Sequence, residues 1–437
     1  MHTVKPGVLK HMIKQIPRFI YPRSLTIPEW QSHTGRHVAP NTFTHNDDTA
    51  VMRLGDFWRA GYDDVRWFCA DIKVPAAFAG KKVYLQLDFG GEALVRINGK
   101  LIGAVSSMDG AAWVHRDILL MPELQEGEVL SVEIENSICA AGFCDAAMDG
   151  AKDTQMQLRC ANLLTVDENT EELYFLVSRV YDALDFIDDS VLRTKVYNAL
   201  DDALHILDFD FDNETFYRSV PEALAFLKET LAKIPKHAPG EVILTGHSHL
   251  DVAWLWTVLE ITRKTARTFS NNLALMDKYP DFRFAQSQAV LYDFMKKHYP
   301  DVFERVKEKV KSGQWCITGN TWVEADTNIA SGESLIRQLL FGRNFFLKEF
   351  GVASDIYWLP DCFGFTWALP QIIKKSGVYE PEEGCLSLLG GPRRCRRYQS
   401  IKVQWQTSDF QTRIKTFAGW TAQIIQHEVD HCDGVLI

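Results

Sequence analysis

From about residue 50 to residue 140, apolar and polar residues alternate in short runs, as in β-strands with one buried face. In KKVYLQLDF the apolar positions recur at every second residue from Val83 to Phe89. The segment ALVRINGKLIG places Asn98-Gly99 between two apolar runs, which is a strong signal for a tight β-hairpin. Several short strands separated by turn residues predict a β-sandwich. Such a sandwich is either a carbohydrate-binding accessory module or a purely structural part.

Between about residues 168 and 235 the apolar residues recur at helical spacing instead. Leu173, Leu176, Val177 and Val180 fall on one face of a predicted helix. The stretch PEALAFLKETLAKI opens with Pro221, a residue type favoured in the first helical turn, so a helix is predicted to begin there. This region is predicted to be a helical connector.

After Pro239-Gly240, short apolar runs that predict strands alternate with longer amphipathic stretches that predict helices. This alternation is typical of parallel β/α units, in a barrel or an open sheet. The predicted strands are EVILTG, FRFAQSQ, QWCITGNTWV and DIYWLPD. The predicted helices are ITRKTARTFSNNLALMDKYP, VFERVKEKVKSG and SLIRQLLFGRNFFLKEFG, the last closed by Gly351. In a barrel, catalytic groups gather where strands end.

Polar residues do follow the predicted strands, in GHSHLDVAWLW, NTWVEADTN and LPDCFGF. His249 and Asp251 are two positions apart on an extended segment, so both side chains leave one face and can share a metal ion. A histidine with carboxylate oxygens suits zinc or a divalent ion of similar preference. Asp361 precedes a turn that would hold its carboxylate at the mouth of the site.

Each of these signals is weak alone, because a His-x-Asp pair is more often a hydrogen-bonded strand end than a ligand pair. Aromatic residues in the same segments belong to a core by default. Their placement beside acids at successive strand ends nevertheless favours a sugar-binding pocket, where rings stack on the sugar and acids bind hydroxyls. These aromatic residues are Trp254, Trp256, Trp322 and Phe363.

Composition narrows the class of protein. The net charge of −10 argues against nucleic acid or an acidic membrane as the main partner. No apolar run reaches the length of a signal peptide core or a transmembrane helix. The nine cysteines are an odd number without regular spacing, which fits reduced thiols. We therefore expect a cytoplasmic protein.

In order along the chain, HSHLDVAWLW, SQAVLYDFM, GNTWVEADTN, GESLIRQLLFGRNFF and WLPDCFGFTWALPQIIKKSG resemble the catalytic domain of family 38 α-mannosidases, over roughly 240–378. The resemblance implies a retaining hydrolase that binds zinc and an α-mannoside oligosaccharide. It makes His249 and Asp251 zinc ligands, and Asp361 both a zinc ligand and the nucleophile. The resemblance also implies a sugar subsite, formed by Trp254 and Phe363 with Asp326 nearby.

The mannosidase resemblance stops near Gly377-Val378. The family's acid/base aspartate and its fourth zinc ligand, a histidine, lie beyond this point, and no later residue here fits either role by motif. Loss of general acid catalysis costs about 10²–10⁴ in rate. We therefore expect impaired activity.

A second metal motif follows in QHEVDHC. On a helix, His427 and His431 would lie on one face beside Glu428, a general base for water bound to the metal. EEGCLSLLGG and FAGWTAQIIQHEVDHCDGVLI resemble the C-terminal half of peptide deformylase, which makes Cys385 the third ligand to Fe²⁺ or Zn²⁺. The first half of that family is absent, and so short a segment would bury too little surface to fold alone.

The sequence thus predicts a multidomain α/β protein, and its expected function is impaired, zinc-dependent α-mannoside hydrolysis. Three alternatives remain: a working peptide deformylase, a non-catalytic carbohydrate-binding protein, and another glycosidase of the same family. The predicted parts are a β-sandwich accessory domain over 1–165, a helical connector over 166–238, a truncated family 38 catalytic domain with an incomplete (β/α) barrel over 239–378, and a small α+β deformylase-like fragment over 379–437.

Overall fold

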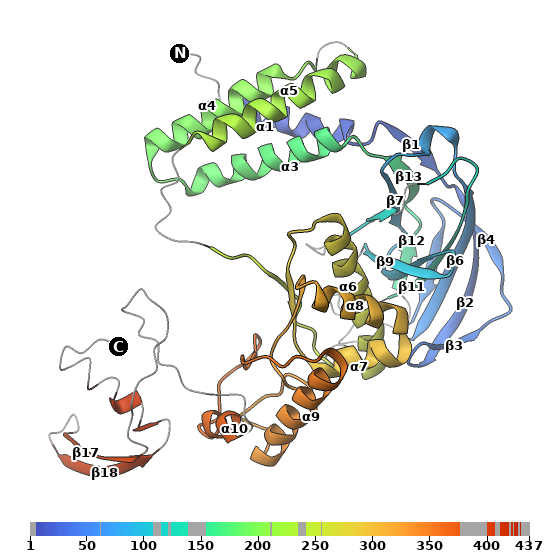
Figure 1. The fold of residues 1–437 in the computed structure, drawn as a ribbon. Helices are drawn as coiled ribbons and strands as arrows, with labels where there is room; N and C mark the ends of the chain where they lie inside the picture. Colours follow the sequence, from blue (N-terminus) through green and yellow to red (C-terminus); the bar gives the residue numbers. More distant parts are fainter. Residues whose placement is uncertain are drawn as a thin grey trace. The chain divides into compact units, whose positions relative to one another are not determined.

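The computed structural model divides the chain into two compact units, Met1–Leu244 with Ala266–Ala274, and Thr245–Thr265 with Leu275–Ile437. Figure 1 shows their helices and strands. The described residues are 6–61, 63–107, 115–120, 124–138, 154–209, 212–234, 242–254, 256–375, 400–406, 411–418, 421–422, 424–426 and 429. Among them, no helix is both long enough and apolar enough to span a membrane.

The first unit contains the predicted sandwich of antiparallel sheets (Figure 1). One sheet runs β1-β13-β7-β10, and a larger one runs β3-β2-β6-β11-β8-β9 with β4 beside β2. Their inner faces bury one apolar core that includes Trp30, Phe68, Leu85 and Ile134. The strands are β1 (Arg23–Thr26), β2 (Glu29–Ala39), β3 (Thr42–His45), β4 (Ala50–Arg53), β5 (Phe57–Ala60), β6 (Asp64–Lys73), β7 (Val83–Asp88), β8 (Glu92–Ile97), β9 (Lys100–Ser106), β10 (Asp117–Leu120), β11 (Val129–Ser137), β12 (Thr154–Gln157) and β13 (Cys160–Thr165), where β5 and β12 form a separate pair.

The hairpin predicted at Asn98-Gly99 is confirmed between β8 and β9. Both turn residues have positive φ, 51° for Asn98 and 75° for Gly99, as a tight turn of the primed type requires. The Asn98 side chain also accepts a hydrogen bond of 2.9 Å from Ser131 N, which ties the turn to β11.

The predicted helical region is also confirmed in the first unit, and its helices bury a separate apolar core. One prediction is wrong: the last helix begins at Asn213, not at Pro221, which lies in its interior. Asp212 sets this start, because its carboxylate accepts a hydrogen bond from Thr215 N. The helices are α1 (Pro6–Gln15), η1 (Ile16–Phe19), α3 (Glu168–Ala183), η3 (Leu184–Phe186), α4 (Ser190–Ile206) and α5 (Asn213–Ala232), and a short turn, η2 (Ala76–Phe78), lies within the sandwich.

The second unit contains a parallel sheet of order β14-β15-β16, and helices follow its strands as predicted. The helix α9 ends at Gly351 with φ 73°, the left-handed cap that glycine favours. The elements are β14 (Gly246–His247), β15 (Phe284–Gln286), β16 (Trp315–Ile317), α7 (Ala289–His298), α8 (Pro300–Lys311), α9 (Gly332–Phe350), α10 (Leu369–Lys375), and the antiparallel pair β17 (Ser400–Gln406) and β18 (Thr412–Ala418), while α6 (Val258–Lys278) contributes to both units.

All four predicted strands of this unit are shorter than expected or absent. FRFAQSQ contributes only Phe284–Gln286 to β15. Of the segment EVILTG, only Gly246 belongs to β14. The pairing of β14 with β15 is limited to Gly246 and His247. β16 ends at Ile317, and the chain then turns through Gly319 and Asn320, which both have positive φ. No strand forms over residues 355–361, where DIYWLPD predicted one; just before it, the backbone of Ser354 bonds to the Asn320 side chain instead of a neighbouring strand.

Gly342 on α9 lies against the segment that follows β16. A Cβ atom there would stand 2.7 Å from Trp322 N and closer still to Asn320 O, both backbone atoms that cannot move aside cheaply. We expect Gly342→Ala to destabilise the second unit by about 1–3 kcal/mol, although alanine is the better helix former. Gly332→Ala on the same helix is the control, because its Cβ would meet only Ile372 Cδ1 at 3.7 Å. Calorimetric unfolding of both variants checks this, and equal midpoints would contradict it.

Candidate metal centre

The carboxyl ends of the three parallel strands lie at one edge of the sheet, and the site is built from the residues that follow them. His249 and Asp251 come after β14, Ser287 and Gln288 after β15, and Glu324 after β16. Residues 355–361 form no strand, but Asp361 at their end also lies beside His249.

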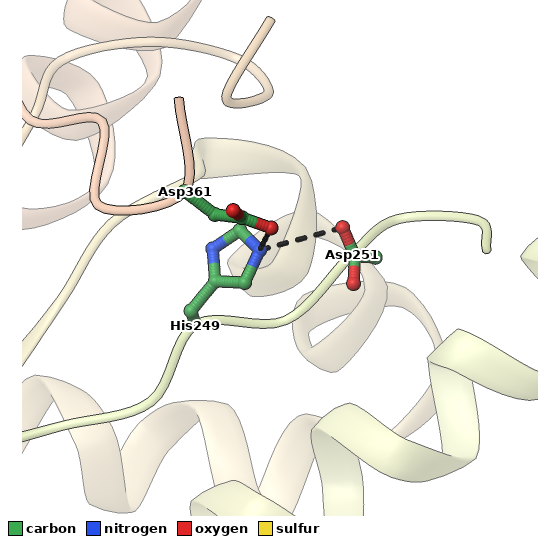
Figure 2. Close-up of side chains that lie close together, drawn as sticks. All are labelled: His249, Asp251 and Asp361. Atoms are coloured by element: carbon green, nitrogen blue, oxygen red, sulfur yellow. Dashed lines mark hydrogen bonds and ion pairs between the residues drawn. The ribbon is translucent and has the colours of Figure 1, made fainter. Parts of the chain in front are cut away.

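His249, Asp251 and Asp361 each offer one ligand atom, and these atoms lie within 4.8 Å of one another. His249 Nε2 is 3.3 Å from Asp251 Oδ1 and 3.6 Å from Asp361 Oδ2 (Figure 2). The sequence predicted that these three side chains converge, and the structure brings them together. One imidazole nitrogen and two carboxylate oxygens form a donor set that suits a divalent metal ion.

Glu324 fixes the other ring nitrogen of His249. Its Oε2 lies 2.6 Å from His249 Nδ1, and its side chain is only 4% exposed. A hydrogen on Nδ1 shared with this carboxylate leaves Nε2 facing the two aspartates, which is how metal-binding histidines are usually oriented. Sequence reasoning missed Glu324, although it lies two residues before Asp326 in the motif NTWVEADTN.

The two neighbouring histidines have opposite pKa shifts. The hydrogen bond that His249 donates to the Glu324 carboxylate raises the pKa of His249 to about 8, against the opposing effect of burial. Burial lowers the pKa of His247, whose Nε2 accepts a hydrogen bond of 3.1 Å from the Trp358 indole. In the metal-free chain at pH 7, His249 is therefore mostly protonated, and a metal ion at Nε2 must displace that proton.

Asp361 is held by its neighbours on both sides of the sequence. Three residues earlier, Trp358 donates to His247 on β14. On the other side is the predicted turn, in which the Cys362 thiol donates to Gly364 O at 3.1 Å and Gly364 has a φ of 129°. The Thr327 hydroxyl also donates to Gly364 O, at 3.3 Å. The Asp361 side chain remains 51% exposed, so a ligand can reach it from solvent.

The predicted sugar-binding residues lie in exposed positions. Trp254 is 52% and Phe363 is 88% exposed. The Trp254 ring meets Trp256 edge-on at 5.5 Å, and the Trp256 indole donates to Asp251 O at 2.9 Å. The Asp326 carboxylate accepts a hydrogen bond of 2.9 Å from Asn328 N, as in an Asx-turn. The residues of the second metal motif, Cys385, His427, Glu428 and His431, lie outside the described part of the chain.

The fold and this cluster define a candidate metal-binding β/α unit in a chain that also carries a β-sandwich and a helical region. Residues 239–381 match the family model of the glycosyl hydrolases family 38 N-terminal domain. Residues 21–164 match that of the alpha-mannosidase jelly roll domain, and residues 355–437 match that of polypeptide deformylase. Both resemblances predicted from the sequence are confirmed.

Curated relatives give the same result. Alpha-mannosidase G of Dictyostelium discoideum is 33% identical over 320 residues, which are 71% of this chain and 29% of that protein. Alpha-mannosidase 2C1 of Homo sapiens is 32% identical over 320 residues, 71% of this chain and 30% of that protein. Peptide deformylase of Clostridium beijerinckii is 48% identical over 68 residues, 16% of this chain and 49% of that protein. The chain thus covers about 30% of the length of these two mannosidases.

In the metal-free chain, we expect His249 to titrate with a pKa of about 8 and His247 with a pKa below 6.5. The pKa of His249 is higher in the folded state, at about 8, than its ordinary value of 6.5 in the unfolded state. Its bond to Glu324 therefore stabilises the fold fully below pH 6.5, and this contribution is lost as the pH rises through 8. Proton NMR of the imidazole signals against pH, with metal removed by a chelator, measures both values. Equal pKa values for the two histidines would contradict this arrangement.

Proposed function

We propose that this chain carries a zinc-dependent α-mannosidase-type site that hydrolyses α-mannosides with retention of configuration. The observation that supports this most is the convergence of His249, Asp251 and Asp361 within 4.8 Å, at the places where the family 38 resemblance implies zinc ligands. We also propose the domain division expected from the sequence: an accessory domain over 1–165, a helical connector over 166–238, an incomplete (β/α) barrel over 239–378 and an α+β deformylase-like fragment over 379–437. The proposed location of the protein is the cytoplasm.

His249 Nε2, Asp251 Oδ1 and Asp361 Oδ2 would hold the zinc ion. Their fit to the ion is supported by the bond from His249 Nδ1 to the buried Glu324, which leaves Nε2 for coordination. When bound, the ion supplies positive charge that attracts adjacent sugar hydroxyls and keeps a neighbouring carboxylate ionised.

Asp361 is the proposed nucleophile. Its exposed carboxylate would attack the anomeric carbon and form a glycosyl ester while the bond from that carbon to the leaving oxygen breaks; water then hydrolyses the ester. Trp254 and Phe363 would stack on the sugar, and Asp326 would accept from its hydroxyls. These three residues are partly or largely exposed, as a surface that receives a ligand requires.

The leaving oxygen needs a proton from a general acid in this mechanism. The family's acid/base aspartate and its histidine ligand have no counterpart by motif in residues 379–437, which instead match polypeptide deformylase. We therefore propose that turnover by this chain is slowed by about 10²–10⁴ relative to a site with its acid.

A second candidate function is removal of the formyl group from N-terminal formyl-methionine. The 48% identity to a peptide deformylase over 68 residues favours it. Cys385, His427 and His431 would hold Fe²⁺ or Zn²⁺, and Glu428 would take the proton of the attacking water.

We expect the purified chain to bind one zinc ion at the first site, and His249→Ala or Asp251→Ala to weaken this binding by more than about 100-fold. A lost ligand costs more than a lost outer partner, which costs about 10–100-fold. Competition with a chromophoric chelator measures the affinity, in a background where His427 and His431 are replaced by alanine. Asp301→Asn in the first turn of α8 is the control. Wild-type affinity in both ligand variants would contradict the site.

We expect hydrolysis of aryl α-mannosides with acidic phenol leaving groups, and almost none of alkyl α-mannosides. An acidic phenol leaves without protonation, whereas an alkoxide needs the general acid. Release of the phenol measures the rate, and Asp361→Asn should abolish it. Release of formate from a formyl-methionyl peptide without any mannoside turnover would instead favour the second candidate. Binding of a mannoside without turnover in either assay would indicate a carbohydrate-binding protein. Faster hydrolysis of another aryl glycoside would indicate a different glycosidase.

A further inference from the structure

Three buried polar side chains bond to the segments around the candidate metal centre, and none of them is a proposed metal ligand or the proposed nucleophile. Ser287 and Gln288 follow the central strand β15, and Glu324 follows its neighbour β16. Ser287 and Gln288 are almost completely buried, as is the carboxylate of Glu324. Burying such groups is costly unless each finds partners, so their bonds show what holds them there.

Gln288 links the loops on either side of it. Its Nε2 donates to Leu250 O at 2.7 Å, between the ligands His249 and Asp251, and its Oε1 accepts from Glu324 N at 3.2 Å. Its backbone has a φ of 63°, a conformation that residues other than glycine rarely adopt. Such strain persists where the surroundings fix the residue, and it is common at functional sites.

Glu324 uses both carboxylate oxygens. Oε2 lies 2.6 Å from His249 Nδ1, and Oε1 accepts a hydrogen bond from the Ser287 hydroxyl. With its backbone nitrogen bonded to Gln288 as well, the residue is fixed at three atoms. The carboxylate therefore cannot rotate without breaking a bond to Ser287 or to His249.

We propose that Glu324, held by Ser287 and Gln288, is a positioning residue that orients the His249 imidazole for metal binding. By keeping the hydrogen of the neutral ring on Nδ1, it leaves the lone pair of Nε2 directed at the space shared with Asp251 and Asp361. This inference rests on the proposed metal site, and it assigns part of the metal affinity to residues that do not touch the ion.

The experiment measures zinc affinity of the full chain by chelator competition, in the same His427/His431 double-alanine background. Glu324→Ala should weaken binding by about 100-fold, and Ser287→Ala by about tenfold. Glu324→Gln should lose no more than about tenfold, because its amide oxygen still accepts from Nδ1. Glu333→Gln, an exposed pair with Arg337 on α9, is the control and should change nothing.

The melting temperature of each metal-free variant separates positioning from a merely structural role. A structural role would lower the melting temperature and leave zinc affinity unchanged in the folded variant, which would overturn the inference. If Glu324→Ala does not fold, the zinc affinities of Glu324→Gln and Ser287→Ala are compared with that of the wild type. Wild-type zinc affinity in both variants would overturn the inference. If only His249→Ala loses zinc, the inference fails and the metal site stands. If the wild-type chain binds no zinc, both fail.

Discussion

The hydrogen bond of 2.6 Å between His249 Nδ1 and Glu324 Oε2 is the interaction on which the candidate metal centre depends. An imidazole on a loop can turn about two side-chain torsions, and without a partner either nitrogen could face the aspartates. The buried carboxylate removes this choice, since Ser287 and Gln288 hold Glu324 in turn. The orientation of a ring that follows β14 is thus set by residues that follow β15 and β16.

This dependence explains why a parallel sheet suits the site. In β14-β15-β16 all three strands deliver their following residues to one edge, and the central strand can reach both neighbours. Ser287 and Gln288 follow that central strand, and Gln288 bonds to the backbone on each side. An antiparallel sheet would send alternate loops to opposite edges, so the same residues could not meet.

The sequence was most informative where local chemistry decides the structure. Asn98-Gly99 specifies its own turn, and Gly351 ends α9 because few other residues adopt its φ. Prediction failed where a distant partner decides, because residues 355–361 looked like a strand but pair with none. It also failed at the start of α5, where the local cap Asp212 begins a helix that Pro221 seemed to open. His249, Asp251 and Asp361 were expected near one another because each follows an apolar run, and the family 38 resemblance made all three ligands. Glu324 was not, because only the fold shows that an acid beside Trp322 and Val323 faces His249.

The same electrostatics links the raised pKa of His249 to the affinity for a cation. Three carboxylates, from Asp251, Asp361 and Glu324, surround one imidazole, so the metal-free cluster has more negative than positive charge even when the ring is protonated. The proton on His249 partly offsets this excess. The hydrogen bond to Glu324 is the main reason that the pKa of the ring rises to about 8, and the charges of Glu324 and Asp251 add to the rise. A divalent ion at Nε2 offsets it further, because two positive charges replace the one that leaves with the proton. The proton and the metal ion therefore compete for Nε2, and the ion brings the larger positive charge to the same carboxylates.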